Sequence, residues 1–255
     1  LGEVSNLRKI CENSLESHTI IGHTRWATHG QVNLENTQPI ILPQIALVHN
    51  GIFENYSNLS NQMLGESNSE SSDTFWWTKC LYKALSTKLI VSADDVLKVL
   101  SDLLKKTQGA WALCFLIESC PNKIFFAKNG SPLLIGRGEN EMWLSSDEYA
   151  LSKECNQIIN LENDQFGWVS CKFLRVYDKF DKESDIFWKT FDKKQSAPRH
   201  VGECMMACEI EEGLDCAIAT LDNFEFNKVA QFLESGAYKK IFITGCGTAF
   251  NAGRV

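Results

Sequence analysis

The chain has 255 residues, of which 44% are hydrophobic and 22% charged, and its formal net charge is −7. A chain of this length and composition can bury one large core or two modest ones, as globular proteins do. The acidic charge and the lack of a basic run argue against a nucleic-acid partner. The longest apolar stretches are too short to cross a bilayer and the first residues do not resemble a signal peptide, so we expect no membrane partner.

Neither the ten cysteines nor the five histidines follow the spacing of a metal site. No Cys-x-x-Cys occurs, and no histidine completes a familiar zinc pattern. We therefore expect neither a metal nor another cofactor. The cysteines are interpreted as buried, reduced thiols of a cytoplasmic protein.

Residues 1–178 are expected to form one unit that begins with short strands and helices. The expected order is a strand at 19–23, a strand at 45–49, and helices at 55–64, 74–85 and 92–106. Asp73 is expected to cap the helix at 74–85, and Ser92 with Asp95 resembles a capping box. Gly109 is a candidate C-cap for the last helix.

A run of antiparallel strands is predicted next, because short apolar segments alternate with turn residues. These segments lie at 110–117, 123–127, 132–135, 141–145, 157–161, 167–171 and 173–177. Helices followed by a run of strands predict an α+β protein built in layers.

Residues 179–204 are expected to connect this unit to a second one. The connection is charged and rich in turn residues, but Phe187, Trp188 and Phe191 are expected to dock on a neighbouring surface. The second unit, residues 205–255, should hold helices at 205–221 and 226–233 and then a strand. The chain looks truncated at both ends, so we expect it to be a fragment of a longer protein.

The segment at residues 23–30 is predicted to line a pocket for a small anionic molecule. A guanidinium such as that of Arg25 offers two parallel donors to a carboxylate, and Thr28 and His29 stand close enough in sequence to help. The alternative is a surface loop in which Arg25 pairs with a structural acid.

Asn50 and Gly51 could supply an amide side chain and a backbone N–H to an oxyanion, whereas the alternative is a hairpin turn. Asp73 could accept hydrogen bonds from a substrate ammonium as well as cap its helix. Cys246, Gly247 and Thr248 end an apolar strand at a helix start, where free N–H groups favour a phosphate. A plain tight turn is the alternative there.

The order of these motifs resembles the glutamine–fructose-6-phosphate amidotransferase family over essentially the whole chain. The segments that carry the resemblance are His23-Thr24-Arg25-Trp26-Ala27-Thr28-His29-Gly30, Val48-His49-Asn50-Gly51, Ser72-Asp73-Thr74, Gly130-Ser131-Pro132-Leu133, Cys208-Glu209-Ile210-Glu211-Glu212 and Gly245-Cys246-Gly247-Thr248. The resemblance implies an αββα sandwich of the N-terminal-nucleophile hydrolase type, known as the class II glutaminase fold. The start of an α/β sugar isomerase (SIS) domain would follow.

The resemblance also implies a role for each matching residue. Arg25 would pair with the α-carboxylate of glutamine, with Thr28 and His29 beside it, and Trp26 would gate the passage of ammonia. Asp73 and the Gly51 backbone would hold the α-amino group, while Asn50 and Gly51 would form the oxyanion hole. Thr248, with Cys246 and Gly247, would hold the phosphate of fructose 6-phosphate. Arg25, Asp73 and Asn50 are therefore expected to meet around one cavity.

Several positions depart from the family's pattern. The family's nucleophile is a cysteine at the mature N-terminus, whereas this chain starts at Leu1, so this polypeptide is expected to be inactive as a glutaminase. Gln38 stands where a histidine is expected, Phe75 where an acid is expected, and Ala249 where many relatives have a hydroxyl.

The expected activity of the parent protein is the formation of glucosamine 6-phosphate from fructose 6-phosphate and glutamine, in a homodimer joined through its isomerase domains. Two alternatives stay open. One is a class II glutaminase with another acceptor, and the other is a degenerate module that only binds glutamine or a sugar phosphate.

Overall fold

The computed structural model describes residues 6–7, 17–24, 33–67, 70–87, 91–151, 154–191, 205–235 and 240. Internal contacts divide the chain into two units, residues 1–197 and 198–255, each of which is described by itself. The segment up to Phe191 therefore clusters with the first unit. Phe191 is buried there and Trp188 packs against buried residues, as expected, but Phe187 is exposed, so the prediction that it docks was wrong.

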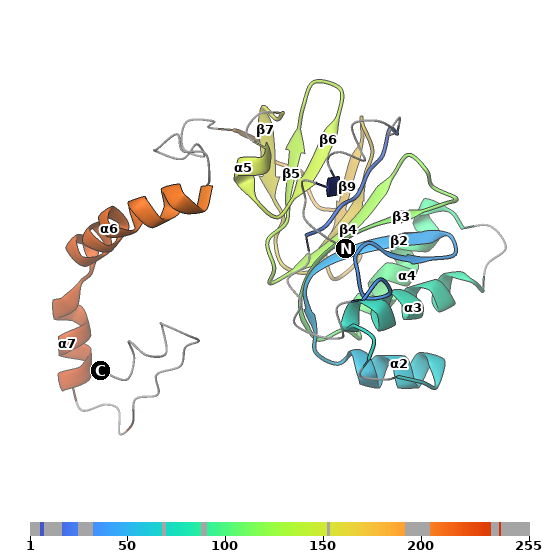
Figure 1. The fold of residues 1–255 in the computed structure, drawn as a ribbon, viewed down its shortest axis with the longest axis horizontal. Coiled ribbons are helices and arrows are strands. Elements are labelled where there is room, and N and C mark those ends of the chain that lie inside the picture. The colour runs from blue at the N-terminus through green and yellow to red at the C-terminus, as the bar shows by residue number, and fades with distance from the viewer. Residues whose placement is uncertain are drawn as a thin grey trace. The chain divides into compact units, whose positions relative to one another are not determined.

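Two antiparallel sheets form the centre of the first unit (Figure 1). The six-stranded sheet has the order β1 (Ile40–Leu42), β2 (Ile45–Phe53), β3 (Gly109–Ile117), β4 (Ile124–Asn129), β8 (Gln165–Val169) and β9 (Leu174–Tyr177). The four-stranded sheet has the order β10 (Lys189–Thr190), β7 (Gln157–Asn160), β5 (Leu134–Arg137) and β6 (Met142–Ser145).

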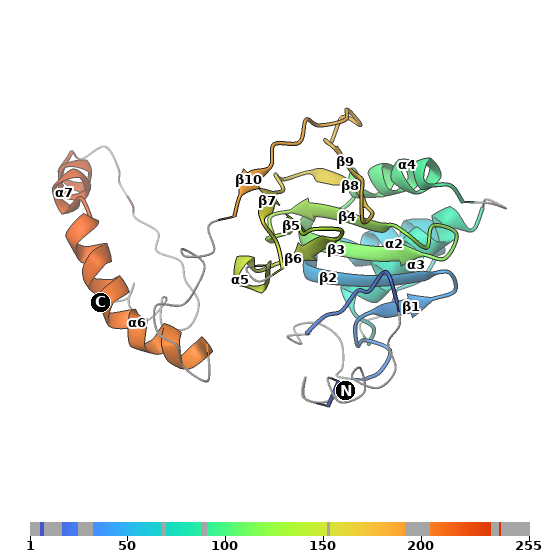
Figure 2. The same ribbon diagram turned by 90° about the horizontal axis from the view of Figure 1, so that it is seen from above.

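Helices lie on the outer side of each sheet. The helices α3 (Asp73–Leu85) and α4 (Ala93–Leu104) pack on the six-stranded sheet, and α2 (Tyr56–Leu64) packs against α3. The short α5 (Glu148–Leu151) lies beside the four-stranded sheet (Figures 1 and 2). Buried residues of both sheets, among them Val48, Phe126 and Ile135, pack together between the sheets. This layering confirms the predicted αββα sandwich.

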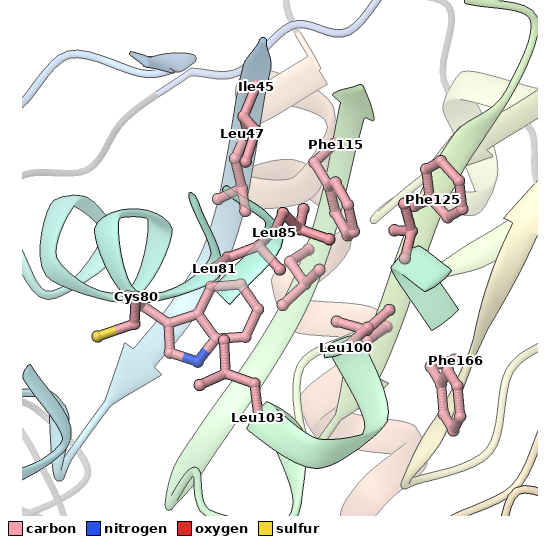
Figure 3. Packing of buried hydrophobic residues seen from close by; sticks show 14 of the residues in the cluster. Ile45, Leu47, Cys80, Leu81, Leu85, Leu100, Leu103, Phe115, Phe125 and Phe166 are labelled. Carbon is pink, nitrogen blue, oxygen red and sulfur yellow. The ribbon is translucent and has the colours of Figure 1, made fainter. Parts of the chain in front are cut away.

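The main core lies between the six-stranded sheet and its helices. Leu81 and Leu85 of α3 and Leu100 and Leu103 of α4 pack toward the strands, as Figure 3 shows. The strands contribute Leu47, Phe115 and Phe125, which are also fully buried. Because removal of this apolar surface from water is the main favourable term in folding, the core fixes α3 against β2 and thereby places the first residue of α3.

Three local predictions were wrong. The segment at 19–23 is not a strand, although Ile21 packs against the cluster between the sheets. Ser72, not Asp73, caps α3, because its Oγ accepts the Phe75 N–H. Gly109 is not a C-cap but opens β3 with φ of 121°. The capping box of Ser92 and Asp95 at the start of α4 is confirmed.

The described part of the second unit consists of two helices, α6 (Met205–Asn223) and α7 (Phe226–Glu234). Both match predicted helices, and both carry exposed apolar side chains such as Leu214 and Phe232. Within the ranges that the structure describes, no helix combines the length and the apolar composition needed to span a membrane.

Candidate functional site

A cluster of buried polar side chains lies where β2 passes the first residues of α3. His49 of β2 is 2% exposed, and Asp73 and Thr74 of α3 are 6% and 3% exposed. Buried polar groups need partners, because water cannot reach them. The cluster therefore marks a place where the polar residues of two elements depend on one another.

The backbone edge of β2 presents donors to this cluster. The strand β1 covers β2 only as far as Leu47, which pairs with Ile40. Beyond that point the His49 N–H donates to Gln38 Oε1 at 2.5 Å, and the Phe53 N–H donates to Asp73 Oδ2 at 2.8 Å. Gly51 lies between these two residues in β2, so backbone donors on either side of it are already engaged.

Asn50 and Gly51 lie inside β2 and not in a turn. They pair with Ala112 and Trp111 of β3, which makes the hairpin alternative wrong. Gly51 has φ of 133°, and a Cβ there would lie 2.0 Å from the Ala110 carbonyl oxygen. Only glycine fits this position. Both residues are exposed, so a small ligand can approach the backbone here.

The carboxylate of Asp73 is available for more than a structural role. An ionised carboxylate has about four acceptor positions. One Asp73 oxygen accepts the Phe53 N–H, and the other lies 3.5 Å from the Thr74 hydroxyl. Because Ser72 provides the cap of α3, the remaining lone pairs of Asp73 can accept hydrogen bonds from a cation.

Asn36 holds the start of α3 in place from the preceding loop. Its Oδ1 accepts the Ser72 N–H at 2.7 Å, and its Nδ2 donates to the Glu70 carbonyl at 2.9 Å. Asn36 is 1% exposed, so these bonds meet no competition from water. Asn36 therefore holds the backbone just before Asp73, while the Phe53 N–H holds its carboxylate.

His49 is a neutral part of the cluster. Burial lowers the pKa of His49 from 6.5 to about 4, although the nearby Asp73 carboxylate and Ala110 carbonyl act in the opposite direction. The ring stacks on Phe53 with centroids 4.0 Å apart, and Nδ1 lies 3.0 Å from Thr74 Oγ1. Among the described residues no group meets the geometry of a hydrogen bond to the buried Nε2, although the Ala110 carbonyl acts on the same ring. Because the His49 imidazole is neutral, it does not form an ion pair with the nearby Asp73 carboxylate.

The segment that leads to Arg25 ends close to β2. The charge of His23 is close enough to lower the pKa of His49 further, and Ile21 packs against the buried cluster that contains Val48. Arg25, Trp26, Thr28 and His29 themselves lie outside the described residues. The same holds for the predicted phosphate loop of Cys246, Gly247 and Thr248.

The candidate site is separate from a cavity of about 620 Å³ that lies between the end of α4 and the strands β3, β4 and β8. Its lining includes Lys105, Lys128 and Lys179 but none of Asn50, Gly51 and Asp73. Over the ranges that the structure describes, no group of acidic, histidine and cysteine side chains is arranged to hold a metal ion.

Two buried cysteines are unsuited to act as nucleophiles, because only the thiolate is reactive. Burial raises the pKa of Cys80 to about 11 and that of Cys114 to about 12. At pH 7.5 we expect iodoacetamide to alkylate the exposed Cys171 and Cys216 first and to modify Cys80 and Cys114 only after unfolding. A time course of peptide mass spectrometry measures this order, and rapid native labelling of Cys80 would contradict it.

Comparison with known proteins decides the family. The family model described as "Glutamine amidotransferases class-II" matches residues 3–134, which is just over half of the chain. The chain belongs to the class-II glutamine amidotransferases. The family match covers β1, β2, α3 and the Asn50–Gly51 pair, so the described cluster lies within the family's own domain.

Curated relatives of this class-II amidotransferase chain extend well beyond it. It is 32% identical to the glutamine–fructose-6-phosphate aminotransferase (isomerizing) of Fusobacterium nucleatum, over 99% of this chain and 42% of the relative. It is also 32% identical to the enzyme of that name from Buchnera aphidicola, over 100% of this chain and 43% of the relative. The chain thus spans less than half the length of these relatives.

Solved structures are more distant. A structure described as the allosteric regulatory enzyme of purine biosynthesis aligns with 62% of this chain and 34% of its own chain. The TM-score is 0.49 and the identity 20%. The family assignment rests on the family model and not on this likeness.

The sequence pattern gives no role in this cluster to three residues that hold it together, Thr74, Asn36 and Gln38. The structure shows that Gln38 accepts a backbone N–H of β2. One signal was visible: His49 is a polar residue inside the apolar run of β2, which predicts a buried partner.

Proposed function

We propose that this chain is the glutaminase part, with the start of the isomerase part, of an enzyme that forms glucosamine 6-phosphate from fructose 6-phosphate and glutamine. The observation that carries the proposal is the contact of the Asp73 carboxylate with β2 two residues beyond Gly51. The relatives that cover nearly the whole chain carry the name of that activity.

In this proposal the exposed edge of β2 binds the amino-acid end of glutamine. Asp73 accepts hydrogen bonds from the α-ammonium together with the Gly51 backbone. Arg25 pairs with the α-carboxylate, with Thr28, His29 and Trp26 around it. A charged hydrogen bond of this kind in a water-poor site contributes more than a neutral one, so Asp73 distinguishes an α-amino acid from other amides.

The chemical step needs stabilisation of a developing negative charge. A nucleophile loses its proton and attacks the side-chain amide carbon of glutamine, and the carbonyl oxygen becomes an oxyanion. The amide nitrogen takes up that proton and leaves as ammonia when the tetrahedral intermediate collapses, and water then hydrolyses the acyl intermediate to glutamate. The Asn50 amide and the Gly51 N–H are proposed to donate to that oxyanion. The raised pKa of Cys80 and of Cys114 argues against either as the nucleophile.

The synthase half is proposed to receive the ammonia in the second unit. There Cys246, Gly247 and Thr248 would hold the phosphate of fructose 6-phosphate through backbone N–H groups. A homodimer joined through the isomerase domains and a cytoplasmic location complete the proposal. Formation of glucosamine 6-phosphate by the full-length protein from glutamine and fructose 6-phosphate tests this half.

The glutamine site is tested by replacing Asp73 with asparagine. We expect Asp73→Asn to weaken L-glutamine binding about 30-fold or more, because truncating one partner of a buried charged hydrogen bond costs roughly 2–5 kcal/mol. Isothermal titration calorimetry of the 255-residue chain measures this directly.

The matched control is Asp94→Asn, which removes an exposed acid from the first turn of α4 and leaves β2 untouched. The control should bind glutamine as the original chain does. If the Asp73→Asn chain binds glutamine as tightly as the original chain, Asp73 is not part of the site. If Asp94→Asn weakens glutamine binding as much as Asp73→Asn does, the effect comes from the change in net charge alone.

A further inference from the structure

We propose that Thr74 is a positioning residue that aims the Asp73 carboxylate at the α-ammonium of the bound amino acid, with His49 as its support on β2. This inference rests on the proposed function and adds a determinant of specificity to it. Thr74 touches no substrate atom in this scheme and acts only through Asp73.

The geometry shows two anchors on one carboxylate. The Phe53 N–H holds Oδ2 of Asp73 at 2.8 Å, and the Thr74 hydroxyl lies 3.5 Å from Oδ1. The last torsion of an aspartate side chain is broad, so a single anchor leaves the plane of the carboxylate free to rotate. The Thr74 hydroxyl makes a longer and weaker contact than the Phe53 N–H, and in this proposal it favours one orientation of the carboxylate plane and so directs the free lone pairs.

The Thr74 hydroxyl is itself fixed by β2. In this proposal the neutral His49 ring carries its proton on Nδ1 and donates it in a hydrogen bond to Thr74 Oγ1, 3.0 Å away, which leaves the single hydroxyl proton of Thr74 for Asp73. The His49 ring also stacks on Phe53. Phe53 also provides the backbone donor for Asp73. The same strand therefore holds both ends of the Asp73–Thr74 pair, and β2 and α3 form one rigid frame around the edge at Gly51.

Burial makes this frame depend on the hydroxyl. Asp73, Thr74 and His49 are all less than a tenth exposed, so water does not take the place of a lost hydroxyl. Burial also keeps the His49 ring neutral. A neutral ring does not form an ion pair with Asp73, and the full negative charge of Asp73 remains available to the ligand ammonium.

The test compares glutamine with 4-carbamoylbutanoate, which is glutamine without its α-amino group. The ratio of the two dissociation constants, measured by calorimetry at pH 7.5, reports on the ammonium contact alone. We expect Thr74→Val, which keeps the shape of the side chain, to reduce the preference for glutamine about 10-fold. Thr74→Ser restores the hydroxyl and should keep the original ratio.

Thr78→Val is the matched control. The Thr78 hydroxyl is fully buried one turn further along α3 and donates to the Thr74 carbonyl at 2.7 Å, but it does not contact Asp73. The control should keep the original ratio. Should Thr74→Val fail to fold, His49→Phe keeps the stacked ring, removes Nδ1 and should reduce the ratio in the same direction.

The possible results distinguish the role of Thr74 from the proposed function of the chain. An original chain that prefers glutamine, with an unchanged ratio in Thr74→Val, overturns this inference and leaves the proposed function standing. An equal loss in Thr74→Val and Thr78→Val also overturns it, because the effect is then that of any buried hydroxyl. An original chain without preference for glutamine overturns the proposed function and this inference together.

Discussion

Replacing Gly51 with alanine should destabilise the first unit by about 3–5 kcal/mol, since steric strain and an unfavourable backbone conformation act together. The φ of 133° is outside the regions that L-residues adopt readily, and the new Cβ would lie 2.0 Å from the Ala110 carbonyl oxygen and 2.9 Å from Ser131 Oγ. The Ala110 backbone cannot move away from the new Cβ without breaking the pairing of β2 with β3. The substitution therefore either strains both strands or disrupts their pairing. Thermal unfolding should show a midpoint lower by roughly 6–20 °C.

Gly65→Ala provides the control for backbone conformation alone. Gly65 ends α2 with φ of 76°, and nothing lies within 4 Å of its added Cβ. This substitution should cost only about 1–2 kcal/mol, the usual penalty for a left-handed L-residue. If Gly51→Ala lowers the stability no more than Gly65→Ala does, the Ala110 carbonyl does not lie close to Gly51 in solution.

Acid should destabilise the first unit through His49. The pKa of His49 is about 4 in the folded state, against an ordinary value of 6.5. Below pH 6.5 the unfolded chain binds a proton that the native state does not accept, so stability falls as the pH falls from about 6.5 to about 4. From pH 7 to pH 4.5 the expected loss from this residue alone is roughly 2 kcal/mol.

Chemical unfolding of the His49→Gln variant measures this contribution. A glutamine side chain does not titrate, so the difference in unfolding free energy between pH 7 and pH 4.5 should be about 2 kcal/mol smaller than in the original chain. The exposed His18 provides the control, because His18→Gln removes an imidazole outside the cluster. The same pH dependence in the original and His49→Gln chains would contradict a buried neutral imidazole.

The sequence predicted the elements well where the local pattern was strong. Apolar residues at helical spacing with a capping box located α4, and short apolar runs between turn residues located β3 to β9. Each of these elements carries its own signal, because period and caps are properties of neighbouring residues. The family motifs added the αββα order of layers, which local patterns alone do not specify.

Local signals were misleading where they competed with a distant contact. Asn50-Gly51 is a strong turn signal, yet pairing with β3 keeps both residues inside β2. Asp73 stands at a cap position, but Ser72 takes that role and the Phe53 N–H takes the carboxylate. Residues far apart in sequence therefore determine the conformation of Asn50–Gly51 and the partner of the Asp73 carboxylate.

The chain by itself determined which polar residues are available at the site: an amide–glycine pair and an acid at the start of a helix. Only the tertiary structure decided how they are used. The packing of α3 on β2 brings Asp73 to the Phe53 N–H and Thr74 to His49, across 20 and 25 positions of the sequence. Hydrogen bonds of this kind depend on the position of two elements, and that position is set by the buried core between them.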